Sequence, residues 1–312
     1  MEIHNDTDHL PEFQNAVITI GAFDGVHKGH LQILQQLTAV AKHVNGTAVV
    51  ITFFPHPKMV VQQDQYKIQL LNTLSEKIEL FEKAGIAHLV IIPFSPAFAE
   101  MEASAYITDF LVKKFKPHSI IIGYDHRFGK NRTGDIRLLQ NLSYSHHYKL
   151  IEIPEHILQN ISISSTRIRH LLQEGDAVAA SELLGYSYFF SGTVAHGEKK
   201  GRWLGFPTAN LEPVNEDKLI PGNGVYAVTV GIEEEVISYK GMMNIGYRPT
   251  FQGVKSTIEV HLFDFNDDLY GKTLRVHLVN KIREEIKFEG IEALQAQLHQ
   301  DRTNALLMLA DK

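Results

Sequence analysis

The organisation of the chain follows from residues 17–30, which read Val17-Ile18-Thr19-Ile20-Gly21-Ala22-Phe23-Asp24-Gly25-Val26-His27-Lys28-Gly29-His30. The first four residues predict a buried strand, and an apolar stripe from Leu31 to Ala41 predicts an amphipathic helix. A glycine-rich turn therefore leads into a helix N-terminus, where unpaired N–H groups and a partial positive charge favour an anion. Because Gly25 and Gly29 let a ligand approach the backbone, the stretch suits a phosphate.

The two histidines of this turn, His27 and His30, have three interpretations. They lie three residues apart and would face one ligand if the turn winds directly into the helix. They could simply hydrogen-bond to nearby backbone. They could bind zinc, although no carboxylate stands at helical spacing and no His-Glu-x-x-His pattern is present. They could also stabilise charge on a triphosphate, which the preceding residues 21–25 favour.

Strand-like runs alternate with helical periods through the first half of the chain. We predict strands at 17–20, 48–54, 87–92, 119–122 and 148–153. We predict helices from residue 31, from a capping box at 73–76 to Gly85, and at 104–115, 136–142, 163–169 and 176–184. This alternation predicts a Rossmann-like α/β domain, a parallel sheet with helices on both faces. Ligands of such sheets bind at the carboxyl ends of strands, where the glycine-rich turns after Ile20 and Ile122 fall.

The pattern changes after Gly185, where strands dominate. We predict strands at 188–195, 224–230, 236–243, 257–263 and 274–279, and a C-terminal helix at 291–309. Spaced strands without helices between them predict an antiparallel β-barrel or sandwich. A chain of 312 residues exceeds the usual size of one domain, so we expect domains at 1–185 and 186–312.

The composition excludes several classes of protein. The absence of cysteine excludes thiolate catalysis, disulfides and cysteine-based zinc sites, and it is compatible with a reducing cytoplasm. A net charge of −6 argues against a broad nucleic-acid surface. Residues 1–6 do not resemble a signal peptide, and the longest apolar run, 89–92, is too short to span a bilayer. We therefore expect a cytoplasmic protein without nucleic-acid or membrane partners, whose oligomeric state stays open.

Two further segments of the first half carry candidate ligands. Ser164-Ser165-Thr166, followed by Arg167 and Arg169, is typical of an ordinary helix start, yet arginine also binds phosphate in a bidentate manner. Beside a phosphate-binding turn, this segment becomes a candidate for the second half of a triphosphate clamp. Asp125 and Arg127 lie in a glycine-bounded loop that could be either a solvated turn or part of a site.

The second half offers an oxygen-rich segment at 201–210. It could be a plain β-turn, but Thr208 and Asn210 would project to the same side of an extended chain and could hold a magnesium–phosphate unit. Glu259 stands in an alternating strand, where a carboxylate is costly unless it is used or paired, so base and salt-bridge partner stay open. No P-loop sequence is present, so any kinase chemistry would use another scaffold.

In this order, these motifs resemble the bacterial bifunctional riboflavin kinase/FMN adenylyltransferase family, also called FAD synthetases, almost from end to end. Residues 21–30, 123–132 and 163–169 are similar to its nucleotidyltransferase motifs, and 205–210 is similar to its kinase hallmark. Further matching segments are 224–226, 244–250, 259–261 and 269–272. The chain departs from the family at Ala22, where asparagine or threonine is frequent, and at His126, where phenylalanine is common.

The resemblance implies a role for each matching residue. His27 and His30 would stabilise the ATP phosphates during adenylyl transfer, and Glu259 would be the base for the riboflavin 5′-hydroxyl. The residues expected to grip the triphosphate from the other side are Ser164, Ser165, Thr166 and Arg169. Asp125 and Arg127 would line the flavin and adenine region, and Arg283 matches a flavin-site segment. The other residues expected to bind nucleotide are Gly21, Phe23, Asp24, Gly25, Gly29, Gly205 and Pro207.

The implied cofactor is Mg²⁺ with ATP, held by Thr208 and Asn210. The implied substrates and products are riboflavin, FMN, FAD, ATP, ADP and pyrophosphate. Two rival interpretations remain at this point. In one, the chain is an FMN adenylyltransferase whose barrel is a flavin-binding regulatory module. In the other, it is a flavin carrier or sensor that binds without turnover.

Overall fold

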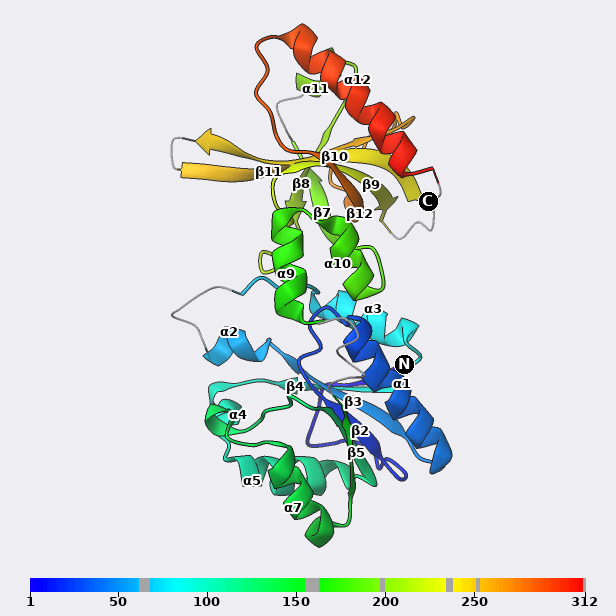
Figure 1. Cartoon of the computed structure of the whole chain (residues 1–312), viewed down its shortest axis with the longest axis vertical. Coiled ribbons are helices and arrows are strands. Elements are labelled where there is room, and N and C mark those ends of the chain that lie inside the picture. Colours follow the sequence, from blue (N-terminus) through cyan, green and yellow to red (C-terminus); the bar gives the residue numbers. More distant parts are fainter. Residues whose placement is uncertain (62–67, 155–162, 197–199, 234–237, 251–252, 311–312) are drawn as a thin grey trace. The chain divides into compact units, whose positions relative to one another are not determined.

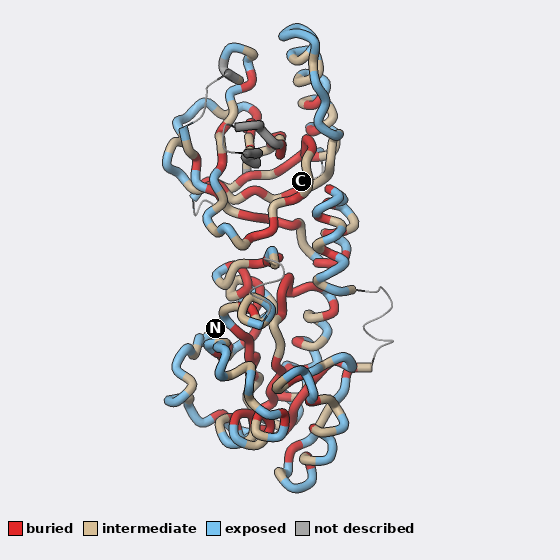
Figure 2. The backbone as a smooth tube through the Cα atoms, turned by 90° about the vertical axis from the view of Figure 1, so that its left-hand side faces the viewer, coloured by how far each residue is buried: buried red, intermediate tan, exposed pale blue. Residues whose placement is uncertain are grey.

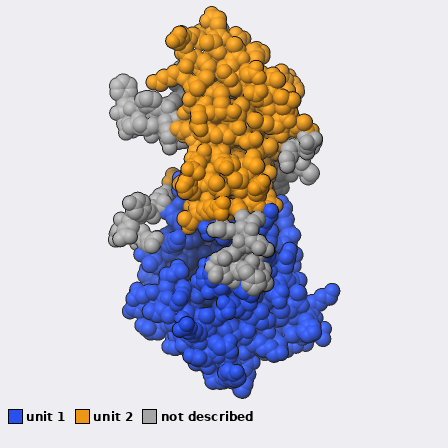
Figure 3. All heavy atoms as spheres, in the orientation of Figure 1, with its two compact units in different colours: residues 1–165 blue, residues 166–312 orange. Residues whose placement is uncertain are grey.

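The computed structural model describes residues 1–61, 68–154, 163–196, 200–233, 238–250 and 253–310. The chain packs as two compact units, Met1–Ser165 and Thr166–Lys312, which are coloured separately in Figure 3. Helices at 165–184 therefore pack with the second unit, whereas we expect the functional boundary near Tyr186. That functional boundary stays a prediction.

The first unit is built on a parallel sheet of order β1-β4-β3-β2-β5-β6. Its strands are β1 (Glu2–His4), β2 (Val17–Ile20), β3 (Ala48–Phe54), β4 (His88–Pro93), β5 (Ser119–Gly123) and β6 (Lys149–Ile153). Its helices are α1 (Lys28–His43), α2 (Pro57–Val61), α3 (Leu74–Lys83), α4 (Pro96–Ala99), α5 (Ala103–Ala105), η1 (Tyr106–Val112), α6 (Lys113–Phe115), η2 (Lys130–Arg132) and α7 (Ile136–His146). The expected α/β sheet is confirmed.

Helices cover both faces of this sheet (Figure 1). On one face, Ile18, Ile51 and Ile120 form a core with Ile107 of η1 and Leu139 of α7. Helix α1 lies against β2, β3 and β5 on the other face. The backbone of the central strands is buried accordingly, as Figure 2 shows.

Three details of the first unit depart from the sequence-based expectations. The helix expected at 104–115 is a π-helix over its central residues, Tyr106–Val112, although its predicted apolar face is buried. The first strand, β1, was not predicted because three edge residues carry too little pattern. Helix α1 begins at Lys28 rather than Leu31, since His27 is its N-cap.

The second unit centres on a closed antiparallel barrel of order β10-β11-β8-β7-β12-β9, which settles the choice between barrel and sandwich. Its strands are β7 (Phe189–Ala195), β8 (Ala209–Pro213), β9 (Gly224–Ile232), β10 (Ser238–Thr250), β11 (Gly253–Leu262) and β12 (Thr273–Arg283). Its helices are α9 (Ser165–Glu174), α10 (Ala177–Leu184), α11 (Lys200–Trp203) and α12 (Ile291–Met308). The predicted strand at 236–243 corresponds to β10, which begins at Ser238. Residues 236–237 of that prediction lie outside the described residues.

The expected C-terminal helix, α12, is confirmed and packs on the barrel. Its residues Ala305 and Leu309, the latter its C-cap, share a core with Phe206, Met242 and Phe263. One barrel strand, β8, was not predicted, although buried Ala209 and Leu211 alternate with more exposed neighbours. Within the part of the chain that the structure describes, we find no helix with the length and apolar character needed to cross a bilayer.

Candidate active sites

The first site lies where the strand order of the parallel sheet reverses. Strands β2 and β5 are neighbours, yet the chain leaves β2 toward β3 and β4 on one side and continues from β5 to β6 on the other. Both predicted glycine-rich turns follow these two strands. Such a switch point is where ligands of open α/β sheets bind, because the outgoing turns diverge there.

The turn after β2 is held in an uncommon backbone conformation. Phe23, Gly25 and Val26 all have positive φ, at 48°, 89° and 35°. Glycine adopts such a value readily, but a β-branched residue does not, so Val26 marks local strain. Strained backbone persists only where the surrounding structure holds it, and it is found most often at active sites and ligand-binding turns. Here the buried ring of Phe23 packs edge-on against Phe81 and His30.

The two imidazoles lie side by side at the start of α1. Their ring centroids are 3.6 Å apart, and the ring planes are nearly parallel, with an angle of 12° between them. His27 is the N-cap, and its Nδ1 accepts a hydrogen bond of 3.3 Å from the His30 N–H. Since Nδ1 accepts, the neutral ring carries its proton on Nε2 and can offer that N–H to a ligand. The two rings therefore lie together, and their facing one common ligand stays a prediction.

Burial keeps both imidazoles neutral at pH 7. It lowers the pKa of His27 to about 4, against a weaker opposing effect of the Asp24 carboxylate. Burial also holds the pKa of His30 well below its ordinary value, and the charges of His27 and Lys77 add to this. Nδ1 of His30 is buried and has no hydrogen-bond partner among the described residues. A bound polyanion would favour the protonated rings, because opposite charge raises the pKa of a base.

Two charged residues hold the turn from within. The buried Asp24 carboxylate accepts hydrogen bonds from the N–H groups of Leu71, at 3.0 Å, and Asn72, at 3.3 Å. Lys77 on α3 donates a hydrogen bond of 2.7 Å to the Ala22 carbonyl. Burial lowers the pKa of Lys77 to about 8, and Asp24 opposes that shift.

Sequence reasoning missed Lys77 altogether. A signal was present, since Lys77 stands three and four residues before Leu80 and Phe81, on the buried face of α3. For Asp24, the structure shows an anchoring role, and direct nucleotide binding stays a prediction. Gly29 is buried within α1.

The segment at 163–169 is connected to this turn through one residue, Ser165. Ser165 Oγ donates a hydrogen bond of 2.8 Å to the Asp24 carbonyl, so it lies beside the glycine-rich turn. Ser164 and Thr166 are exposed and Arg169 is half-buried. Thr166 and Arg169 pack with the second unit, and their roles in holding a triphosphate stay predictions.

The loop after β5 leaves its predicted ligands exposed. Asp125 and Arg127 both face solvent, and Arg127 pairs with Asp135 at 3.4 Å. His126 between them stacks on Phe128, and burial lowers its pKa to about 4. A neutral imidazole at this position packs on the Phe128 ring.

The second site forms where β8 pairs with β11. Asn210 lies directly opposite Glu259 in the antiparallel register, so their side chains leave the same face of the barrel wall. Thr208, two residues before Asn210, donates a hydrogen bond of 3.3 Å from Oγ1 to Oε2 of Glu259. The structure thus brings the hydroxyl of Thr208 and the amide of Asn210 close to a carboxylate that lies 51 residues after Thr208.

A cavity of about 630 Å³ adjoins this cluster. Its walls include Pro207, Thr208, Val260 and the loop residues 265–270. His261, to which sequence reasoning assigned no role, lies with Nδ1 2.7 Å from the Pro207 carbonyl. Since a carbonyl only accepts, Nδ1 carries the proton, and the buried ring positions the turn that leads to Thr208. Gly205, with φ of 79°, allows the preceding bend.

Arg283 is engaged within the barrel. Its Nε lies 2.9 Å from the fully buried carboxylate of Asp301 on α12, its Nη2 lies 2.7 Å from it, and Nη1 donates to the Glu284 carbonyl. This bidentate pair fastens α12 to β12. A flavin-binding role of Arg283 stays a prediction.

Comparison with known proteins agrees with this division into two sites. The family model described as FAD synthetase matches residues 9–167, and the one described as riboflavin kinase matches residues 184–309. The chain is similar to proteins named bifunctional riboflavin kinase/FMN adenylyltransferase. One, from Listeria monocytogenes, is 35% identical over 95% of this chain and 93% of its own length. Another, from Escherichia coli, is 36% identical over 97% and 95%.

A solved structure from Streptococcus pneumoniae, described as a macrolide-efflux protein, is 30% identical and superposes with a TM-score of 0.86 over 97% of both chains. That description applies to the Streptococcus pneumoniae protein. The superposition shows that the fold of that protein is similar to this one over nearly the whole chain. The two matched domains, the identities to curated relatives and the coverage of their full lengths lead to one assignment: the chain belongs to the bifunctional riboflavin kinase/FMN adenylyltransferase family.

Proposed function

We propose that the chain carries out two successive ATP-dependent transfers. Its C-terminal domain phosphorylates riboflavin to FMN, and its N-terminal domain adenylylates FMN to FAD with release of pyrophosphate. The observation that supports the proposal is the hydrogen bond between Thr208 and Glu259, because a carboxylate that can accept a proton lies beside a hydroxyl that can bind phosphate. A purely regulatory barrel would not need that pairing.

In the kinase step, the 5′-hydroxyl of riboflavin attacks the γ-phosphorus of ATP. The new O–P bond forms as the bond to the β–γ bridging oxygen breaks and ADP leaves. A neutral alcohol must lose its proton in this step, and Glu259 accepts it. Thr208 orients the carboxylate through its hydrogen bond.

The same cluster suits a hard divalent cation. Thr208 and Asn210 supply a hydroxyl oxygen and an amide oxygen, the kind of donor that magnesium prefers when phosphates complete its coordination. Mg²⁺, when bound with ATP, neutralises charge on the transferring phosphates. Thr208 and Asn210 would hold it, and Thr208 also lines the cavity described above.

In the adenylyl step, a phosphate oxygen of FMN attacks the α-phosphorus of ATP, and pyrophosphate leaves as the bond to the α–β bridging oxygen breaks. The attacking phosphate is already ionised at pH 7, so no base is required. Catalysis therefore rests on placement and on charge stabilisation. His27 and His30 supply N–H groups from the helix start. Ser164, Ser165, Thr166 and Arg169 hold the triphosphate from the other side, and Asp125 and Arg127 contact the flavin and adenine.

One chromatographic time course tests the proposal. Incubation with riboflavin and Mg-ATP should yield FMN first and FAD afterwards, with ADP and pyrophosphate as the other products. If FMN never appears while supplied FMN is converted to FAD, the chain is an adenylyltransferase with a regulatory barrel. If neither flavin product forms, it is a carrier. Fractionation of cells would test the cytoplasmic location that the composition predicts.

A further inference from the structure

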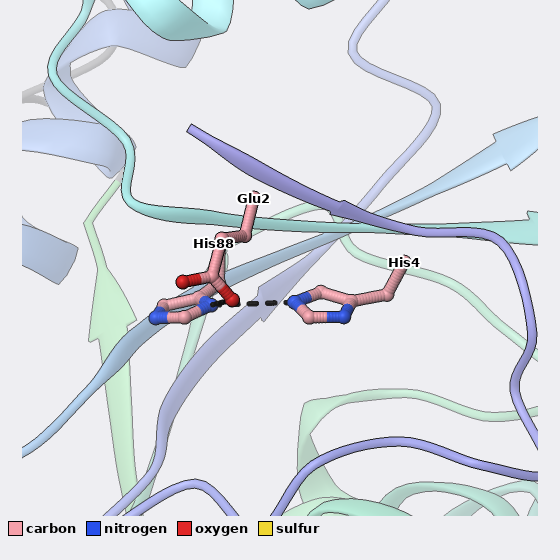
Figure 4. Close-up of side chains that lie close together, drawn as sticks. All are labelled: Glu2, His4 and His88. Carbon is pink, nitrogen blue, oxygen red and sulfur yellow. Dashed lines mark hydrogen bonds and ion pairs between the residues drawn. The ribbon is translucent and has the colours of Figure 1, made fainter.

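Three metal-binding side chains converge at the edge of the parallel sheet, away from the switch point. Glu2 and His4 alternate along β1 and so leave the same face of the strand. His88 begins β4 and is the register partner of Glu2. Figure 4 shows the two imidazoles and the carboxylate directed toward one another. These three residues lie near the amino ends of β1 and β4, whereas the two glycine-rich turns follow the carboxyl ends of β2 and β5.

The ligand atoms of these three side chains lie close to one another. Nε2 of His4 lies 3.3 Å from Nδ1 of His88, which lies 3.6 Å from Oε2 of Glu2. The three ligand atoms all fall within 4.8 Å of one another. Bonds of about 2.0–2.1 Å at tetrahedral angles would separate two nitrogen ligands of zinc by roughly 3.3–3.4 Å. The pair of imidazoles therefore needs little movement to share one ion.

Protons alone satisfy this cluster poorly. Nδ1 of His88 faces both a second imidazole nitrogen and a carboxylate oxygen, so a single proton on it can be donated well to only one of them. A cation would satisfy all three lone pairs together.

The rings are also held in place by their surroundings. Phe13 packs edge-on against His4 at 5.6 Å and against His88 at 5.5 Å between centroids. Both histidines are half-buried, while the Glu2 carboxylate side chain is 73% exposed and leaves an entry path from solvent. Packing that orients ligating rings in advance reduces the cost of assembling a metal site.

We propose that Glu2, His4 and His88 bind one divalent transition-metal ion of the zinc class, with a water molecule in the fourth position. Two imidazoles and one carboxylate form a donor set that zinc accepts and that magnesium does not favour. The site is therefore distinct from the magnesium–ATP chemistry of the barrel. An ion there connects the three-residue edge strand β1 to β4 and stabilises the sheet edge.

The test uses the full-length chain after removal of metal with a chelator. Titration with Co²⁺ should produce the visible absorption of a tetrahedral centre, and Zn²⁺ should displace it at one ion per chain. Zn²⁺ should also raise the melting temperature. His4→Gln and His88→Gln should each weaken Zn²⁺ binding at least as much as the roughly 10–100-fold that loss of a supporting contact costs a metal site.

A matched control is His9→Gln, since His9 and Asp6 form an exposed imidazole–carboxylate pair at 2.7 Å that belongs to no three-ligand cluster among the described residues. This variant should bind Zn²⁺ like the wild type. Glu2→Gln changes an exposed side chain and tests the site even if the histidine variants fold poorly. FMN and FAD formation with Mg-ATP should be unchanged in Glu2→Gln. Absence of the Co²⁺ absorption, or equal Zn²⁺ affinity in the wild type and all these variants, would overturn the proposal.

Discussion

The two candidate active sites are assembled in opposite ways. His27 and His30 belong to one helix start, and a hydrogen bond across three residues sets their arrangement. Thr208 and Glu259 lie 51 residues apart and meet because β8 pairs with β11. The first site depends on local backbone conformation, whereas the second depends on strand register. A register shift of one residue would turn Glu259 to the other face of the barrel wall.

The largest expected loss of activity concerns the barrel site, which depends on the pairing of β8 with β11. Glu259→Gln keeps an oxygen acceptor for the Thr208 hydroxyl but cannot take a proton. We expect riboflavin phosphorylation to fall by about 10²–10⁴-fold, while FAD formation from supplied FMN persists. Glu289→Gln, an exposed change in the loop before α12, is the control and should leave both rates unaltered. Loss of both activities in folded Glu259→Gln protein would refute the division of labour.

The reciprocal variant tests the locally built site. His30→Ala removes one imidazole but keeps the backbone N–H that the His27 side chain caps. FAD formation should slow by about 10²–10³-fold, the cost of one charge-stabilising donor, while FMN formation continues. Separate assays of FMN and FAD after a single incubation measure both effects. Unchanged adenylyl transfer would mean that the stacked rings do not contact the reacting phosphates.

Acid should destabilise the turn that carries His27. The folded-state pKa of His27 is about 4 and its ordinary value is 6.5, so the unfolded chain binds the proton more tightly. Stability from the neutral ring is therefore complete above pH 6.5 and is lost as pH falls toward 4, by on the order of 3 kcal/mol. His27→Asn retains a cap without titrating and should lose less stability between pH 7 and pH 5. Denaturant unfolding at both pH values measures the difference, and equal acid sensitivity would contradict the assignment.

The smallest expected loss of activity concerns the Thr208 hydroxyl, which donates a hydrogen bond to Glu259. Thr208→Val keeps the shape of the side chain but leaves Glu259 without that donor, so kinase transition-state stabilisation should fall by about 1.5–3 kcal/mol. Thr208→Ser restores the hydroxyl and should recover most of the rate. Measurement of kcat and KM for riboflavin phosphorylation distinguishes them. If valine and serine behaved alike, the hydrogen bond would have no catalytic consequence.

Much of the fold was accessible from sequence because periodicity reports burial directly. The alternation of strands and helices predicted the parallel sheet, and the capping box at Thr73 and Glu76 was confirmed by its reciprocal hydrogen bonds. Strand β8 was missed because its start follows the Gly205–Pro207 bend, whose turn-like residues obscured the alternation beyond it. The π-helix at Tyr106–Val112 was missed because its apolar residues also fit an α-helical period.

Residue chemistry, spacing and the family resemblance predicted candidate side chains for each site, and the strand–helix order predicted which end of the sheet carries the first one. Only the tertiary structure determined what those side chains do for one another. It turned Asp24 inward to hold residues 71–72, buried Lys77 beneath the Ala22 carbonyl, and placed Glu259 opposite Asn210. The reason is physical: a helix cap involves neighbours in the chain, whereas burial and strand register arise from contacts between distant segments.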